Sequence, residues 1–185
     1  KAGATVDQIG NNAVRQRALL MRSDSRVVLG SGAALPATGG GEFTGYVKFT
    51  PSGDITGTTL ISQHKEDPAI LIMGCDHDGR FYARTDTSIN SINSPVKVTT
   101  TKNYESYSYP IHVVSTYASG DRSLKLYVNG ELESESPPFA RTAGNNNTNI
   151  VLGRSEFNIV ENSFTGWIDE LGVASGALTS DEIRD

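Results

Sequence analysis

The chain has very little cysteine. Its 185 residues include one, Cys75, which cannot form an internal disulfide. This excludes the class of small secreted domains that are built on several disulfide bonds. Because Cys75 lies in an apolar run, we expect it to be buried as a small hydrophobic residue.

Long hydrophobic runs are also missing. No run approaches the roughly 18 apolar residues of a membrane-spanning helix, and no positively charged segment is followed by the hydrophobic core of a signal peptide. The chain opens with Lys1 instead of methionine, so we expect a processed module that is part of a larger polypeptide or assembly.

Positive charge is scarce. Lysine and arginine number 16 against 21 aspartates and glutamates, giving a formal net charge of -5. Non-specific nucleic-acid binding needs a positive surface that displaces phosphate counterions, so this balance argues against nucleic acid as a partner.

Common catalytic motifs are absent. The three histidines, His64, His77 and His112, are too scattered for a zinc signature. There is no nucleophile elbow and no pair of cysteines, and the glycine run 39–41 lacks the lysine and helix of a phosphate-binding loop. These absences favour a protein that is not an enzyme.

What the chain does contain is many short strand-like segments bounded by Gly, Pro, Asn, Asp or Ser. Residues 1–13 are polar and predict a leader or linker, and residues 14–185 predict one domain. Only Thr179 to Arg184 has a helical pattern. The expected strands lie at 14–29, 43–49, 60–63, 69–75, 81–84, 96–99, 111–117, 124–128, 132–134, 150–153 and 167–174. Strands without intervening helices indicate an all-β, antiparallel two-sheet sandwich or jelly roll.

The Asn129-Gly130 pair predicts a hairpin whose register follows from parity. A two-residue loop would put Glu131 and Glu133 on the same face as Val128. We therefore expect a three-residue loop with a bulge, which pairs Leu126 with Leu132 inside the sandwich and Lys125 with Glu133 outside.

Four segments of the last third occur in a familiar order. They are Leu124 to Leu132 (LKLYVNGEL), Ile150 to Arg154 (IVLGR), Phe164 to Leu171 (FTGWIDEL) and Ala177 to Ile183 (ALTSDEI). This order resembles the laminin G-like and concanavalin A-like lectin (jelly-roll) domain family, and weaker matches extend the resemblance over residues 14 to 184. The resemblance implies a jelly roll that closes with a short helical turn.

Tyrosines suggest the ligand site. Tyr104, Tyr107 and Tyr109 alternate with polar residues in the segment 102–109, and tyrosine rings can stack on the apolar faces of sugars. The alternative is that Tyr109 stands where the family has a core tryptophan and packs into the sandwich.

Aspartates suggest a metal site. Asp76 and Asp78 precede Gly79 as calcium ligands often do, although a plain hairpin turn explains them as well. Strand alternation places Asp169 with Trp167, Leu171 and Val173 on the inner face, where a carboxylate needs a hydrogen-bonding partner or a metal ion. Calcium is therefore the candidate cofactor, and the acidic loop residues Glu66, Asp67 and Asp121 are further oxygen donors.

The alternative that the chain is an enzyme depends on three alternating glutamates, Glu131, Glu133 and Glu135. Jelly-roll glycoside hydrolases of the laminarinase type use alternating carboxylates on one strand. Here no Asp lies between them and Pro137-Pro138 ends the strand, so we expect a solvated edge that resists aggregation.

The resemblance and the residues together predict a non-catalytic recognition or adhesion module. It would bind a glycan or a protein surface through rim loops, with calcium as the candidate assisting ion, in an extracellular or surface-exposed protein. The alternative is a structural or decoration domain of a virion, fibre or cell-surface assembly, and a hydrolase-like enzyme is the third.

Overall fold

The computed structural model describes residues 5–9, 16–22, 25–29, 41–63, 71–89, 92–106, 109–141, 149–154 and 162–184. The strands are β1 (Thr5–Ile9), β2 (Gln16–Met21), β3 (Val27–Leu29), β4 (Phe43–Pro51), β5 (Thr58–Gln63), β6 (Leu71–Cys75), β7 (Phe81–Ile89), β8 (Ile92–Thr99), β9 (Ile111–Ala118), β10 (Ser123–Val128), β11 (Glu131–Glu135), β12 (Ile150–Leu152), β13 (Asn162–Ser163) and β14 (Gly166–Ser175). The helix is α1 (Ser180–Arg184).

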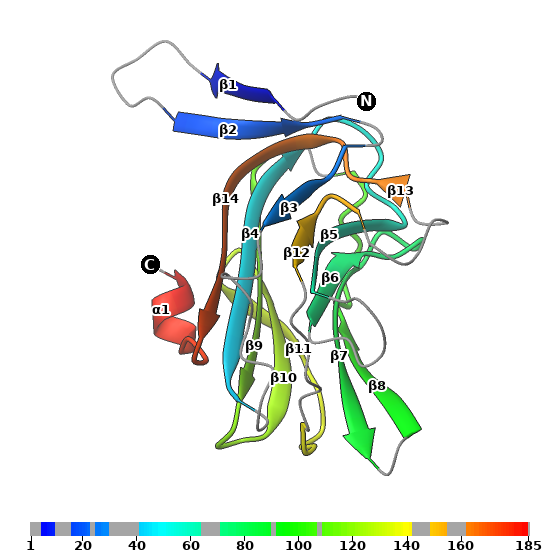
Figure 1. Cartoon of the computed structure of the whole chain (residues 1–185), viewed down its shortest axis with the longest axis vertical. Helices are drawn as coiled ribbons and strands as arrows, with labels where there is room; N and C mark the ends of the chain where they lie inside the picture. Colours follow the sequence, from blue (N-terminus) through cyan, green and yellow to red (C-terminus); the bar gives the residue numbers. More distant parts are fainter. Residues whose placement is uncertain are drawn as a thin grey trace.

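The strands form two sheets that face each other (Figure 1). Sheet A has the order β1-β2-β14-β4-β9-β10-β11, and sheet B has the order β3-β12-β5-β6-β7-β8. The pairs along both orders are antiparallel, and the short β13 lies parallel to β5. Neighbours such as β14 and β4 are far apart in sequence. The expected all-β jelly-roll sandwich is confirmed.

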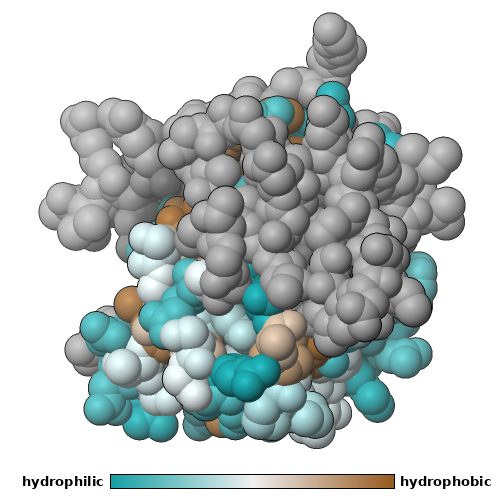
Figure 2. All heavy atoms as spheres, turned by 60° about the horizontal axis from the view of Figure 1, so that its bottom comes forward, coloured by the Kyte–Doolittle hydropathy of each residue, from teal (hydrophilic) through white to brown (hydrophobic). Residues whose placement is uncertain are grey.

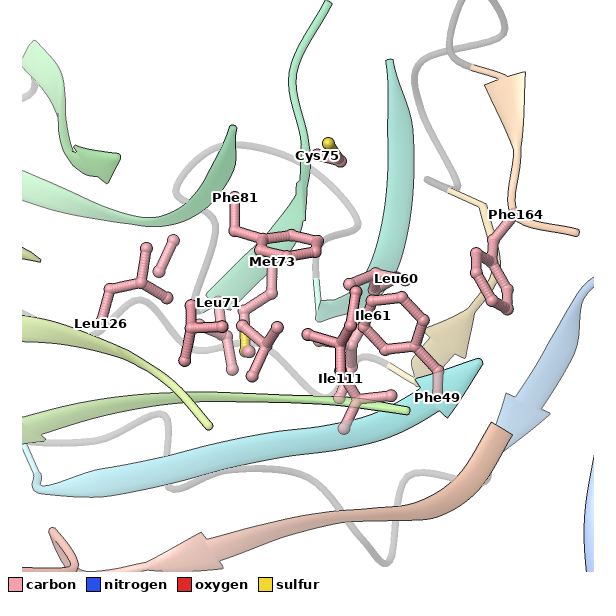
Figure 3. Close-up of a cluster of buried hydrophobic side chains, with 14 of the residues drawn as sticks. Phe49, Leu60, Ile61, Leu71, Met73, Cys75, Phe81, Ile111, Leu126 and Phe164 are labelled. Atoms are coloured by element: carbon pink, nitrogen blue, oxygen red, sulfur yellow. The ribbon is translucent and has the colours of Figure 1, made fainter. Parts of the chain in front are cut away.

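The core lies between the sheets because alternate residues of the strands point inward. In β9, Ile111 and Val113 are buried in the main cluster, whereas Val114 points to the opposite face. Phe49 of sheet A meets Phe81 of sheet B edge to face at 5.8 Å between ring centroids (Figure 3). Burying such a side chain contributes about 1.5–3 kcal/mol. Cys75 is buried in this core, as predicted.

The N-terminal end contains a strand that the sequence did not indicate. Thr5–Ile9 forms β1 and pairs with β2 in sheet A, and the leader or linker expected at residues 1–13 stays a prediction. The run expected at 14–29 is divided between the sheets, with β2 in sheet A and β3 in sheet B.

The hairpin between β10 and β11 corrects the predicted register. Val128 pairs with Glu131, so Asn129 and Gly130 form a two-residue loop, with φ of 52° and 80°. Positive φ at both positions is typical of a type I′ turn. The bulge lies further along, where Tyr127 pairs with Leu132 but Leu126 pairs with Ser134. The bulge leaves Glu133 unpaired in the ladder, so the pairs of Leu126 with Leu132 and Lys125 with Glu133 are wrong.

A second bulge, in β14, changes which residues of this strand face the core. In the ladder with β4, Ile168 pairs with Phe49 and Glu170 pairs with Lys48, so Asp169 is the extra residue. Ile168 is buried in the core and Trp167 is only half-buried. Strict alternation through Trp167 and Asp169 fails because the bulge shifts the side-chain parity by one position.

Helix α1 covers part of the outer face of sheet A (Figure 1). Thr179 and Glu182 form a capping box: the Thr179 N–H donates to Glu182 Oε2 (2.8 Å), and the Glu182 N–H donates to Thr179 Oγ1 (3.4 Å). Ile183 is buried against Val114 and Tyr127 of the sheet. This packing stabilises a helix that is too short to persist alone.

Candidate functional site

Three turns lie at the upper end of the sandwich in Figure 1, at residues 52–57, 76–80 and 100–106, and together they form what we call the rim. Asp76 Oδ1 accepts the N–H groups of Asp78 and Arg80, each at 3.0 Å. The Tyr104 N–H donates to the Gly79 carbonyl at 2.7 Å, which ties two of the turns together. The rim is therefore a preformed surface.

The tyrosines do not form one platform on the rim. Tyr104 is 3% exposed and its ring packs on Phe81 at 5.0 Å, so its face is closed to a ligand. Its hydroxyl donates to Glu133 Oε1 at 3.1 Å. Tyr109 is 55% exposed and differs from the core position that the family resemblance allowed. Tyr107 lies outside the described residues. Burial of Tyr104 follows from its tertiary position, which alternation with polar residues does not reveal.

The candidate metal ligands are not brought together. Asp76 and Asp78 lie in the turn after β6 of sheet B, whereas Asp169 lies in β14 of sheet A. Desolvation raises the pKa of Asp169. Among the residues that the structure describes, no group of three or more His, Cys, Asp or Glu side chains could hold a metal ion. Glu66 and Asp67 lie outside those residues, and Asp121 hydrogen-bonds Lys125 at the other end of the sandwich.

The three glutamates are separated by the β11 bulge. Glu133 Oε1 is 2.6 Å from Lys102 Nζ, and its side chain is only 6% exposed. Glu131 lies beside the same lysine at 3.8 Å. Glu135 instead accepts a hydrogen bond from the Ser123 hydroxyl at 2.6 Å. The expected fully solvated edge is thus incorrect for Glu133, because the bulge turns this side chain toward Lys102 and Tyr104.

A hollow of about 310 Å³ lies on the outer face of sheet A, and the sequence alone did not single it out. We call it the Asn129 hollow. Its lining residues come from β4, β9, the β10–β11 turn, β14 and α1; they are Lys48, His112, Asn129, Gly130, Glu170, Ile183 and Arg184. The signal for the Asn129 hollow in the sequence was a polar residue at an outward-facing position in each of β4 and β9. These residues, Lys48 and His112, pair across the two strands.

The polar groups of the Asn129 hollow are held by the fold. Asn129 Oδ1 accepts a hydrogen bond from the backbone N–H of His112 at 2.8 Å. This bond fixes the Asn129 side chain and therefore the direction of its amide Nδ2. Lys48 Nζ and Glu170 Oε1 are 3.9 Å apart, which leaves both groups room to bind a ligand. Burial lowers the pKa of His112, so its imidazole is neutral near pH 7 and can donate and accept. The Tyr46 ring contacts the His112 ring edge to face at 6.1 Å.

A second hollow of about 310 Å³ lies on the other side of α1. Its lysine is engaged more closely than Lys48 is: Lys125 hydrogen-bonds Asp121 and lies 3.7 Å from Glu135, whereas Lys48 and Glu170 are 3.9 Å apart, beyond hydrogen-bond distance. The Asn129 hollow is therefore the better candidate for binding a polar ligand.

Within the described residues, no helix has the length and hydrophobicity to cross a membrane.

The same fold occurs in several solved structures. Domain 4 of AbnA, a GH43 extracellular arabinanase from Geobacillus stearothermophilus, in complex with arabinotriose, has a TM-score of 0.72 at 18% identity; the match covers 98% of this chain and 80% of that one. The Ruminococcus gnavus IT-sialidase CBM40 bound to α2,3 sialyllactose has a TM-score of 0.69 at 15% identity, covering 90% and 94%. The binding domain of Paraclostridial Mosquitocidal Protein 1 has a TM-score of 0.74 at 15% identity, covering 100% and 45%.

A sequence search of curated proteins finds no match. A laminin G-type family model of the concanavalin A-like lectin/glucanases superfamily matches residues 22–184, and the chain therefore belongs to that superfamily.

Proposed function

We propose that this chain is a non-catalytic glycan-binding module that holds its ligand in the Asn129 hollow. The observation that carries the proposal is the polar lining of this hollow, which is fixed on neighbouring strands of a rigid sheet. The fold likeness to carbohydrate-binding structures supports the ligand class.

Sugar hydroxyls donate and accept hydrogen bonds, and the lining offers both kinds of partner. Asn129 and Lys48 supply donors, Glu170 supplies an acceptor, and neutral His112 supplies one of each. Because the Asn129 side chain is already fixed by its bond to His112, little conformational entropy is lost when a ligand binds.

The same lining argues against hydrolysis. Glycoside hydrolases use two carboxyl groups on either side of the scissile bond, about 5–10 Å apart. Glu170 is the single carboxylate that lines the Asn129 hollow among the described residues. On the rim, Glu131 and Glu133 both converge on Lys102, so they do not face each other across an open cleft.

Calcium-assisted binding through Asp76, Asp78 or Asp169 stays a prediction. The described geometry does not fit a calcium site well, because Asp76 Oδ1 already accepts two backbone N–H groups and Asp169 lies on the other sheet. Binding in the Asn129 hollow needs no metal ion in our proposal, and a chelator arm in the experiment tests this point.

We further propose that the module belongs to a larger, surface-exposed protein. A binding module of this kind keeps its ligand close to the rest of that protein without breaking a bond.

A glycan array followed by calorimetry on the retained glycan tests the proposal. We expect Asn129→Gly and Glu170→Gln to weaken binding at least tenfold, and Tyr109→Ser, at an exposed position outside the hollow, to leave it unchanged. Gly suits the positive φ of residue 129, so the first variant removes the amide without straining the turn. EDTA should not change the affinity.

Two results would contradict the proposal. Loss of binding in Tyr109→Ser, with no effect in the two hollow variants, would place the ligand at Tyr109 instead. Retention of no glycan at all, with assembly on a protein partner, would favour the structural or decoration domain instead.

A further inference from the structure

Arg141 is a buried cation at the end of the sandwich opposite the rim. It is 5% exposed, and its guanidinium carbon lies 5.0 Å from the centre of the Phe43 ring and 6.0 Å from that of Tyr117. Figure 2 brings this lower end of the molecule forward and shows a mainly hydrophilic surface over its described residues. A guanidinium on aromatic faces is held firmly in place.

The Arg141 guanidinium has more N–H donors than there are acceptors bonded to it among the described residues. Nε donates to Thr85 Oγ1 at 3.3 Å, and Nη1 donates to the Gly41 carbonyl at 2.9 Å. A guanidinium carries five N–H groups. The Arg141 guanidinium makes no further hydrogen bond to the residues that the structure describes, so its other N–H groups are left for a ligand.

No described carboxylate forms an ion pair with Arg141, although six ion pairs occur elsewhere among the described residues. Glu42, which follows Gly41, is engaged with Ser119, whose N–H and hydroxyl donate to its Oε1 at 3.0 and 2.7 Å. The side chain of Asp86, which follows Thr85, lies outside the described residues. Burial lowers the pKa of Arg141 to about 10, so the group is still charged at pH 7. A buried charge without a counter-charge is costly and is retained where it serves a purpose.

We propose that Arg141 forms a second binding site, separate from the Asn129 hollow, for a ligand that carries an oxyanion group such as the carboxylate or sulfate of an acidic sugar. The planar guanidinium presents parallel N–H donors that match an oxyanion in a bidentate arrangement. Phe43 and Tyr117 fix the plane of the group, and the Gly41 carbonyl and Thr85 hydroxyl fix its rotation. The site adds an anionic component to ligand recognition at the end of the module opposite the rim.

The Arg141 Nε–H signal in the ¹⁵N-labelled protein gives a direct test. The signal is assigned by its disappearance in Arg141→Lys, and the wild type is then titrated with sodium glucuronate, sodium sulfate, glucose and sodium chloride at matched ionic strength. We expect a saturable shift with glucuronate or sulfate and none with glucose or chloride. A response to glucuronate alone identifies a carboxylate ligand, and a response to sulfate alone identifies a sulfated one.

An unchanged Arg141 signal with both oxyanions would overturn the proposal, and so would an equal response to chloride. Because this readout uses the wild type, it remains valid if Arg141→Lys folds poorly, in which case the signal is assigned by triple-resonance experiments. Asn129→Gly serves as the matched control: it should keep the anion response, so failure of the glycan proposal and failure of this one are distinguishable.

Discussion

Asn129 and His112 are joined by two hydrogen bonds of 2.8 Å: the Asn129 N–H donates to the His112 carbonyl, and the His112 N–H donates to Asn129 Oδ1. The type I′ turn and the outer face of β9 are thereby locked together. A residue that sets the turn thus also sets the geometry of the hollow.

This pair predicts different outcomes for two substitutions of Asn129. Alanine loses the side-chain bond, worth about 1 kcal/mol, and pays a further cost of about 1–2 kcal/mol for its positive φ. We expect Asn129→Ala to lower the free energy of unfolding by about 2 kcal/mol and Asn129→Gly to lower it by about half as much. Urea denaturation checks the order, and equal losses would show that φ at residue 129 is not costly.

Gly74 and Gly53 predict opposite tolerance to an added methyl group. A Cβ at Gly74 would lie 2.3 Å from the Thr58 carbonyl oxygen and 3.0 Å from the Tyr82 hydroxyl, whereas a Cβ at Gly53 would meet no heavy atom within 4 Å. We expect Gly74→Ala to destabilise the protein by about 1–3 kcal/mol, because backbone must shift. Gly53→Ala should change stability by less than about 0.5 kcal/mol. Similar melting temperatures for both variants would contradict the packing between β5 and β6.

Cys75 should be inert in the native protein. Burial, followed by the negative charge of Asp76, raises the pKa of the thiol to about 12, so little thiolate exists at pH 8. We expect Ellman's reagent to leave the native chain unmodified and to titrate one thiol after unfolding in guanidinium. Rapid reaction in native buffer would place Cys75 outside the core.

Asp169 should make the protein less stable as its carboxyl ionises. Desolvation raises the pKa of Asp169 in the folded state above its ordinary value of 3.8, so the folded state holds this proton more tightly than the unfolded state does. The contribution of this group to stability therefore falls as pH rises from 3.8 through the raised pKa. We expect Asp169→Asn to flatten the stability profile in this window and to leave the protein at least as stable at pH 7. Loss of stability at pH 7 would instead reveal a favourable ionised partner for Asp169.

Most strand positions could be predicted from the sequence because a strand that is buried on one face needs alternating apolar residues. Ile111 and Val113 follow this rule, and so do Leu124 and Leu126, which are all in the core. The closing helix was predicted at Thr179 to Arg184 from its cap and occurs at Ser180–Arg184.

The candidate site was predicted less well. Bulges near Glu133 and at Asp169 each shift the parity by one residue, and periodicity cannot detect an extra residue in one strand. The three tyrosines were grouped by sequence spacing, yet Tyr104 packs in the core while Tyr109 is exposed. The lining of the Asn129 hollow comes from five separate elements, so no local motif marks it.

The sequence by itself determined that this chain forms an antiparallel sandwich, because the apolar period of two and the turn residues between short strands allow few other arrangements. Tertiary structure alone decided which polar groups meet. His112 reaches Asn129, and Arg141 lies between Phe43 and Tyr117 without a carboxylate partner among the described residues, because strand pairing joins positions that are distant in the chain.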